Sequence, residues 1–131
     1  MSRDWDAASY DRVSDPQVAM ARAVLERLPL EGGETVLDAG CGSGRVTELL
    51  LERLPRGHVV AVDSAPSMAE HARAALDPQR ATVLCQSLTD LTLDEPADAA
   101  FSNAVFHWIA DHERLFERLH AALRPGAQLV A

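Results

Sequence analysis

Residues 36–44 run VLDAGCGSG, a short apolar segment followed by an acidic residue and three alternating glycines. Gly40, Gly42 and Gly44 carry no side chains, so the backbone there can turn tightly and approach a ligand closely. A helix that follows such a loop presents unpaired N–H groups at its N-terminus. We therefore predict a strand, a ligand-binding loop and a helix in immediate succession.

Apolar segments of strand length alternate with amphipathic segments along the rest of the chain. We predict strands at 35–37, 58–62, 81–85 and 97–102, and a fifth from 128. We predict helices at 14–29, from 45, from 64, and from 111 to a stop at Pro125-Gly126. This alternation indicates a Rossmann-like, doubly wound parallel sheet with helices on both faces. We expect one domain over 1–131, with an N-terminal segment at 1–30 and a β/α core at 34–131.

The composition excludes several classes of partner. Twelve basic against twenty acidic residues give a net charge of −8, which disfavours nucleic acid. No apolar run reaches the roughly 18 residues of a membrane-spanning helix, and the N-terminus lacks the pattern of a signal or transit peptide. We expect a cytoplasmic protein whose Cys41 and Cys85 are reduced thiols.

Two carboxylates narrow the choice of ligand. The glycine spacing is G-x-G-x-G and not the G-x-G-x-x-G of dinucleotide sites, and Asp38 precedes Gly40 by two positions. A carboxylate there repels a pyrophosphate but favours an ammonium or sulfonium group. Asp63 ends the second predicted strand, where a carboxylate either binds ribose hydroxyls or caps the next helix. An NAD site and an ordinary tight turn remain the alternatives.

Residues 36–44 resemble, almost position for position, the first motif of class I methyltransferases dependent on S-adenosyl-L-methionine (SAM). The resemblance extends over nearly the whole chain, including the segment FSNAVFHW at 101–108. Within the family it is greatest to the small-molecule group that includes trans-aconitate and malonyl-acyl-carrier-protein methyltransferases. It implies transfer of a methyl group to a small molecule, a carboxylate oxygen being one expected acceptor, with S-adenosyl-L-homocysteine as the product. A non-catalytic SAM-binding module is the main alternative.

The resemblance also implies a set of cofactor-binding residues. These are Trp5, Tyr10, Asp38, Gly40, Cys41, Gly42, Gly44, Asp63, Ser64, Met68, Ser87, Leu88, Asn103 and Ala104. Asp38 and the glycine backbone would hold the methionine end of SAM, and Asp63 would bind the ribose. Met68 would pack on the adenine unless it is a core residue. The family usually has Asp at the position of Ser87, so the contact to the adenine amine would be weaker here.

The remaining implied positions lie outside the central loop. Asn103 and Ala104 would lie beside the methionine moiety, although Asn103 could instead cap a turn. Trp5 and Tyr10 would belong to an N-terminal cover over the cofactor, or they are loose surface aromatics. His107 is the catalytic candidate, with a structural role as the alternative. The histidines are not accompanied by paired cysteines or suitably spaced acids, so no metal site is expected.

Relatives of this kind continue beyond a fifth strand, whereas this sequence stops at Ala131. We therefore expect a form truncated after that strand, with the C-terminal strands of the family missing. An unpaired edge strand there would invite pairing with another chain, including a second copy.

Overall fold

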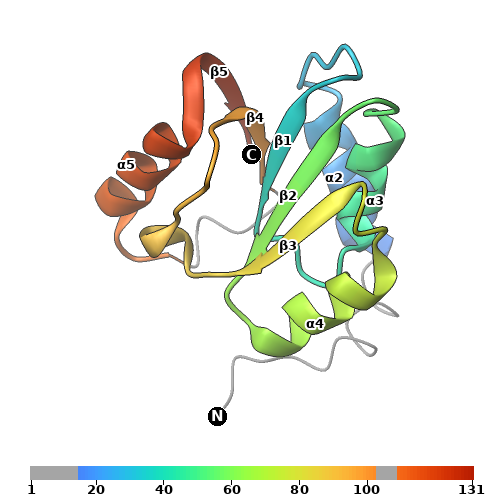
Figure 1. The fold of residues 1–131 in the computed structure, drawn as a ribbon, viewed down its shortest axis with the longest axis horizontal. Coiled ribbons are helices and arrows are strands. Elements are labelled where there is room, and N and C mark those ends of the chain that lie inside the picture. Colours follow the sequence, from blue (N-terminus) through green and yellow to red (C-terminus); the bar gives the residue numbers. More distant parts are fainter. Residues whose placement is uncertain (1–14, 103–108) are drawn as a thin grey trace.

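A computed structural model describes residues 15–102 and 109–131. Its centre is a parallel sheet in the order β3-β2-β1-β4-β5, shown in Figure 1. The strands are β1 (Thr35–Ala39), β2 (His58–Asp63), β3 (Ala81–Cys85), β4 (Ala97–Phe101) and β5 (Leu123–Val130). From β1 the chain adds strands toward one edge of the sheet, and from β4 it adds them toward the other. The carboxyl end of β1 therefore lies at the switch point where ligands bind in such sheets.

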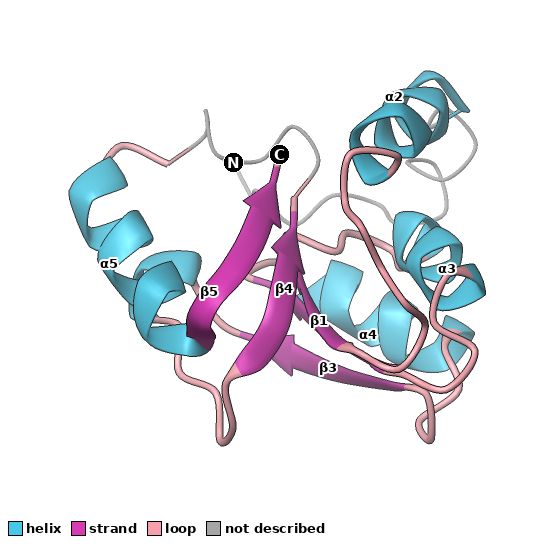
Figure 2. Cartoon of the chain, turned by 90° about the horizontal axis from the view of Figure 1, so that it is seen from above, coloured by secondary structure: helices cyan, strands magenta, loops and turns pink. Residues whose placement is uncertain are grey.

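Helices cover both faces of this sheet, as Figure 2 shows. On one face lie α2 (Asp15–Leu25), α3 (Arg45–Glu52) and α4 (Pro66–Ala75). On the other lie α5 (His112–Ala122) and the short 3₁₀ helix η1 (Leu88–Asp90), which pack against each other. The doubly wound α/β fold predicted from the sequence is therefore confirmed.

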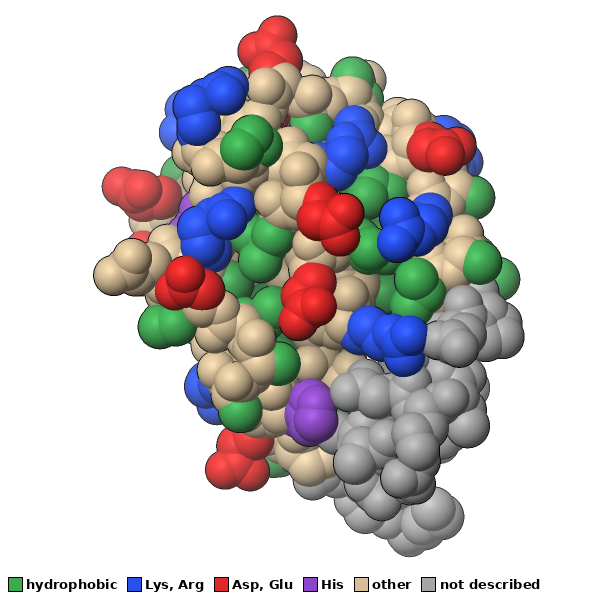
Figure 3. Space-filling model, turned by 90° about the vertical axis from the view of Figure 1, so that its right-hand side faces the viewer, with side chains coloured by type: hydrophobic (Ala, Val, Ile, Leu, Met, Phe, Trp, Pro, Cys, Tyr) green, Lys and Arg blue, Asp and Glu red, His purple; other side chains and the backbone are tan. Residues whose placement is uncertain are grey.

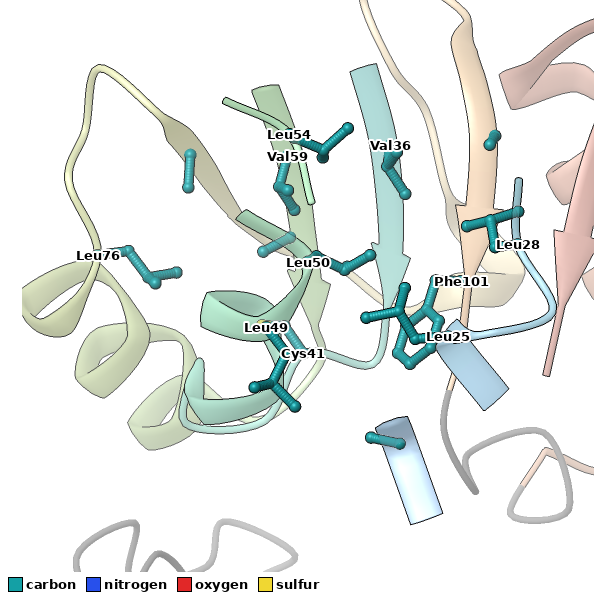
Figure 4. Packing of buried hydrophobic residues seen from close by; sticks show 14 of the residues in the cluster. Leu25, Leu28, Val36, Cys41, Leu49, Leu50, Leu54, Val59, Leu76 and Phe101 are labelled. Atoms are coloured by element: carbon teal, nitrogen blue, oxygen red, sulfur yellow. The ribbon is translucent and has the colours of Figure 1, made fainter. Parts of the chain in front are cut away.

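The two faces enclose separate apolar cores because neighbouring strand residues point to opposite sides of the sheet. Val36 and Val59 belong to the core under α2, α3 and α4, part of which appears in Figure 4. Leu37 and Val62 belong to the core under α5. All four side chains are fully buried, which explains why the central strands are continuous apolar runs.

The main difference from the predicted elements lies in the fifth strand. We expected Pro125-Gly126 to stop a helix and the strand to begin at Gln128, but α5 ends at Ala122 and β5 begins at Leu123. The prediction was wrong because β5 lies at the sheet edge, where a proline without an N–H is tolerated. Pairing with β4 is irregular here, shifting register between Ala97 and Ala99, and Gly126 has φ +82°.

Other boundaries differ by a few residues. The helix predicted at 14–29 is observed as α2, which ends at Leu25, and the fourth strand ends at Phe101. The predicted cap Asp111 is present: its side chain accepts a hydrogen bond from the Arg114 N–H at 3.0 Å. Among the described residues, no helix is long and apolar enough to cross a membrane.

Charge is mixed on the helix-rich side of the molecule. Figure 3 shows arginine and acidic side chains interspersed over the face that carries α3 and α4. An alternating surface of this kind gives a nucleic-acid backbone no continuous basic patch on this face.

Candidate cofactor site

The glycine loop after β1 has the backbone conformation that its residue types permit. Gly40, Gly42 and Gly44 have φ values of +88°, +57° and +94°, a region that residues with a Cβ rarely adopt. The loop is also attached to the neighbouring strand: the N–H groups of Gly40 and Cys41 both donate to the Val62 carbonyl, at 2.8 and 2.9 Å. The turn that was predicted from glycine spacing is therefore formed at the carboxyl edge of the sheet.

Gly44 has a second task, because it is the N-cap residue immediately before α3. A Cβ at this position would lie 3.3 Å from both the Ala72 Cβ and the Leu76 Cδ1 of the α4 region. The missing side chain therefore lets α4 pack directly against the loop. Loop conformation and helix packing are fixed at one residue.

Asp63, the last residue of β2, connects the two loops at this edge. One carboxylate oxygen accepts the Gly42 N–H at 2.8 Å, and the other accepts the Ala65 N–H at 2.9 Å. The second contact is local and resembles helix capping, whereas the first spans 21 residues and holds the glycine loop. A carboxylate has about four acceptor sites, so two donors leave capacity for ribose hydroxyls. The ribose role stays a prediction.

Asp38 is held differently. It is 2% exposed, and its Oδ2 accepts the Thr47 hydroxyl at 2.6 Å. The pKa of Asp38 is raised to about 7, mainly because the carboxyl is buried. The Thr47 hydrogen bond lowers this pKa, and the charge of Asp63 makes a smaller contribution that raises it. A carboxylate with this pKa changes charge near neutral pH, and a nearby cation would favour its ionised form.

Cys41 packs as a core residue although it lies within the loop. It is 5% exposed and lies beside Leu49 in the core under α3, as Figure 4 shows. Burial, together with the charges of Asp38 and Asp63, raises the pKa of the thiol well above its usual range. A thiol that stays protonated is a poor nucleophile. Cys41 and Cys85 are both free, as predicted.

The residues implied for the adenine lie in the segments that follow β2 and β3. Asp63 pairs in register with Cys85, and the Gln86 N–H donates to the Asp63 carbonyl at 3.1 Å, so the two strand ends are adjacent. Ser64 and Ser87 are exposed, whereas Met68 and Leu88 are buried at 5% and 6% exposure. The adenine contacts of Met68, Ser87 and Leu88 and the cofactor contact of Ser64 stay predictions.

Two buried hydroxyls at this edge were not predicted as site residues. Thr47 bonds Asp38, and the Ser102 hydroxyl donates to the Ala39 carbonyl at 2.8 Å; both residues have 0% exposure. The Ser102 N–H also donates to the Val130 carbonyl, so this residue joins the ends of β1, β4 and β5. For Ser102 the available signal was a polar residue directly after an apolar strand.

Five of the implied residues cannot be placed. Trp5, Tyr10, Asn103, Ala104 and the catalytic candidate His107 lie outside the described residues. Within residues 15–102 and 109–131, no group of three or more His, Cys, Asp or Glu side chains is arranged to hold a metal ion.

Comparison with known proteins adds independent findings. A family model described as a methyltransferase domain matches residues 36–126, from the start of the glycine motif into β5. The chain is 40% identical to trans-aconitate 2-methyltransferase of Variovorax paradoxus over 126 residues, covering 96% of this chain and 48% of that protein. It is 42% identical to the trans-aconitate 2-methyltransferase of an Azoarcus species, covering 95% of this chain and 49% of that protein. The chain thus spans about half the length of the curated relatives it matches.

Solved structures give the same result for the fold. An S-adenosylmethionine-dependent methyltransferase from Mesorhizobium loti is 33% identical with a TM-score of 0.70, covering 80% of this chain and 49% of that one. A Haloferax volcanii methyltransferase, solved in complex with the activator Trm112, is 27% identical with a TM-score of 0.84, covering 98% of this chain and 60% of that one.

Proposed function

The chain belongs to the methyltransferase-domain family, and from this premise we propose that it binds SAM over the glycine loop and transfers the methyl group to a small carboxylic acid. One observation carries the location of the site. The loop of positive-φ glycines is held by the Asp63 carboxylate at the switch point of the sheet. This arrangement puts backbone N–H groups, a helix N-terminus and two carboxylates at one edge.

The residues present fit the chemistry of SAM. The cofactor carries an ammonium and a sulfonium, and Asp38 and Asp63 supply negative charge at adjacent strand ends. Asp63 retains acceptor capacity for a pair of hydroxyls after bonding Gly42 and Ala65. The start of α3 offers backbone donors for the carboxylate of the methionine moiety.

When bound, SAM supplies an activated methyl group, so the tasks of the chain are to bind and to orient. Correct alignment of two reacting groups is worth on the order of 7–11 kcal/mol of a barrier. The loop suits this task because its backbone is attached to β2 and α4 by close contacts. A carboxylate acceptor is already a nucleophile at neutral pH and needs no general base. An alcohol or amine acceptor would need one, for which His107 is the candidate.

The proposed cofactor is tested by calorimetric titration of the chain with SAM, S-adenosylhomocysteine and NAD. We expect both SAM compounds to bind and NAD not to bind, because Asp38 repels a pyrophosphate. Binding of NAD without binding of either SAM compound would show that the site is a dinucleotide site.

The proposed acceptor rests on the relatives, whose printed name is trans-aconitate 2-methyltransferase. Methyl transfer from labelled SAM to a panel of small carboxylic acids, with trans-aconitate included, tests it. Labelling of at least one acid is expected. Binding of SAM with no transfer to any acid, from this chain and from a full-length relative under the same conditions, would identify a SAM-binding module instead.

We further propose that residues 1–131 act as one domain, and that the reduced thiols of Cys41 and Cys85 reflect a cytoplasmic location. We also propose that the β5 edge can pair with a second copy of the chain. Supporting this, β5 is an edge strand of the described sheet, and Phe116 beside it is 47% exposed in a groove with Leu123 and Leu129. Analytical ultracentrifugation distinguishes a dimer from a monomer.

A further inference from the structure

Thr47 lies in the first turn of α3, and its side chain is completely buried. Its hydroxyl donates to Asp38 Oδ2 at 2.6 Å across nine residues of sequence. Burying a carboxylate is costly, and a hydrogen bond from a buried hydroxyl offsets part of that cost. A valine of nearly the same shape would fill this space without a polar atom, so packing alone does not explain the threonine.

The surroundings of Asp38 leave Thr47 as the group that favours its charge. The end of β2 contributes the like charge of Asp63, and the loop contributes the Cys41 thiol, whose own ionisation is suppressed. The positive charge of Arg73 on α4 lowers the pKa of the Cys41 thiol. On the other side of β1, the register partner of Asp38 is the apolar Phe101 of β4. Among the described residues, the hydrogen bond from the Thr47 hydroxyl is the interaction that stabilises the ionised form of Asp38.

We propose that Thr47 is a positioning residue for cofactor binding, which holds the Asp38 carboxylate in the orientation and charge state that the cationic methionine end of SAM requires. This inference rests on the proposed function. Asp38 is buried, so it attracts a cation through its charge across a weakly screened interior. Thr47 is therefore expected to change cofactor affinity without contacting the cofactor itself.

The geometry has a consequence for pH dependence. The pKa of Asp38 is about 7 with the Thr47 hydrogen bond in place, and that bond lowers it. Removing the hydroxyl therefore raises the pKa, so that Asp38 stays protonated to a higher pH. Removing a hydrogen bond to a charged group shifts the pKa of that group by about one unit. At neutral pH the ionised fraction would fall about fivefold, and apparent SAM affinity would fall with it.

The test compares Thr47→Val with Thr47→Ser, which keeps the hydroxyl. The carboxyl ¹³C resonance of Asp38 is followed by NMR, and SAM affinity is measured by calorimetry, from about pH 6 to about pH 8.5. We expect Thr47→Val to raise the Asp38 midpoint by about one pH unit and to weaken SAM binding about fivefold at neutral pH. Thr47→Ser should restore both values to within experimental error.

Ser102→Ala is the matched control, because it also removes a fully buried hydroxyl at the same sheet edge. Its hydroxyl bonds a backbone carbonyl, so the variant should lose stability without moving the Asp38 midpoint. Should Thr47→Val not fold, Thr47→Cys retains a weak donor of similar size and should give a smaller shift in the same direction.

An Asp38 midpoint that is unchanged in the Thr47 variants, or that Ser102→Ala moves equally, would overturn the inference. These outcomes are separate from a failure of the proposed function. If the unmodified chain binds no SAM, the proposed function fails, while the NMR titration still reports whether Thr47 controls the charge of Asp38.

Discussion

The ends of β1 and β2 lie side by side, and each carries an aspartate, yet the two carboxylates are held in opposite ways. Asp38 is 2% exposed and accepts the side-chain hydroxyl of Thr47. Asp63 is half-buried and accepts two backbone N–H groups, one from each adjoining loop. The carboxylate at the end of β1 therefore places charge behind the loop, whereas the carboxylate at the end of β2 gives the loop its shape.

This difference shows how one sheet edge can separate two requirements of a cofactor site. A polar group that contacts a ligand needs free acceptor capacity and access, which Asp63 has. A group that supplies attraction by charge gains from burial, because a weakly screened charge acts more strongly. Burial also makes that charge costly to the fold, so stability and binding oppose each other at Asp38.

The largest effect is expected where the β1 loop meets α4. Gly44→Val would force a side chain into φ +94° and against Ala72 and Leu76. We expect a loss of ~3 kcal/mol in the free energy of unfolding, from backbone strain and overpacking together. Urea unfolding of the variant and of the unmodified chain measures this difference.

Two other glycines provide the controls for that variant. Gly126 also has a positive φ, but nothing lies within 4 Å of a Cβ there, so Gly126→Val should show the backbone strain alone. Gly33 has neither feature, and Gly33→Ala should be nearly neutral. Equal losses for Gly44→Val and Gly126→Val would mean that the contact with α4 does not matter.

The next effect concerns Asp63 and separates its two tasks. Asp63→Ala removes the acceptor for Gly42 and the proposed acceptor for the ribose. Charge-assisted hydrogen bonds contribute about 1.5–3 kcal/mol, so SAM affinity should fall roughly tenfold to a hundredfold in calorimetric titration.

Asp98→Ala is the control for Asp63→Ala. Asp98 also accepts a backbone N–H of β1, from Thr35 at 2.9 Å, but at the opposite end of that strand. It should reduce stability and leave SAM affinity unchanged. An unchanged affinity in Asp63→Ala would remove Asp63 from the ribose role.

A smaller effect, with an opposite sign for stability, is expected at Asp38. Its pKa in the folded chain is about 7, above its ordinary value of 3.8, so the folded state binds more protons than the unfolded state between these values. Stability of the unmodified chain should therefore fall as pH rises through that window. Asp38→Asn removes this dependence and should be more stable by ~2 kcal/mol at alkaline pH.

The same variant should bind SAM more weakly above neutral pH, where the lost charge matters. Urea unfolding at acidic and alkaline pH, paired with calorimetry, measures both changes. Parallel stability profiles for Asp38→Asn and the unmodified chain would show that Asp38 does not titrate in this range.

The smallest effect concerns the two thiols, which contrast in the same way as the two carboxylates. Cys85 is exposed at the end of β3, whereas Cys41 is buried and the pKa of its thiol is raised. Ellman's reagent should react at once with Cys85 and with Cys41 only after unfolding. Cys85→Ser should therefore show no fast reaction; a fast reaction in that variant would mean that Cys41 is accessible.

Much of the fold was predictable because its signals are local. Apolar runs placed the third strand at Ala81–Cys85 as observed, and the alternate glycines predicted the loop whose φ values are all positive. The fifth strand was mispredicted because Pro125 and Gly126 resemble a helix stop, and only the position of β5 at the sheet edge makes them compatible with a strand.

The site was predictable only where one residue type carries the chemistry. Asp38 and Asp63 were identified by position, but the sequence did not distinguish their surroundings, since burial and donors arise from packing. Thr47 and Ser102 were missed for the same reason. The Ser102 hydroxyl reaches a carbonyl 63 residues away, a contact that exists only once β1 and β4 are neighbours.

A crystal structure of the chain with S-adenosylhomocysteine would show whether this sheet edge is the cofactor site. We expect the ribose hydroxyls within hydrogen-bond distance of the Asp63 carboxylate, and the methionine moiety over the loop at Gly40–Gly44 with its ammonium on the side of Asp38. Asp63 should retain its bond to the Gly42 N–H. A nucleoside bound elsewhere, or a ribose that makes no contact with Asp63, would contradict the assignment of this sheet edge as the cofactor site.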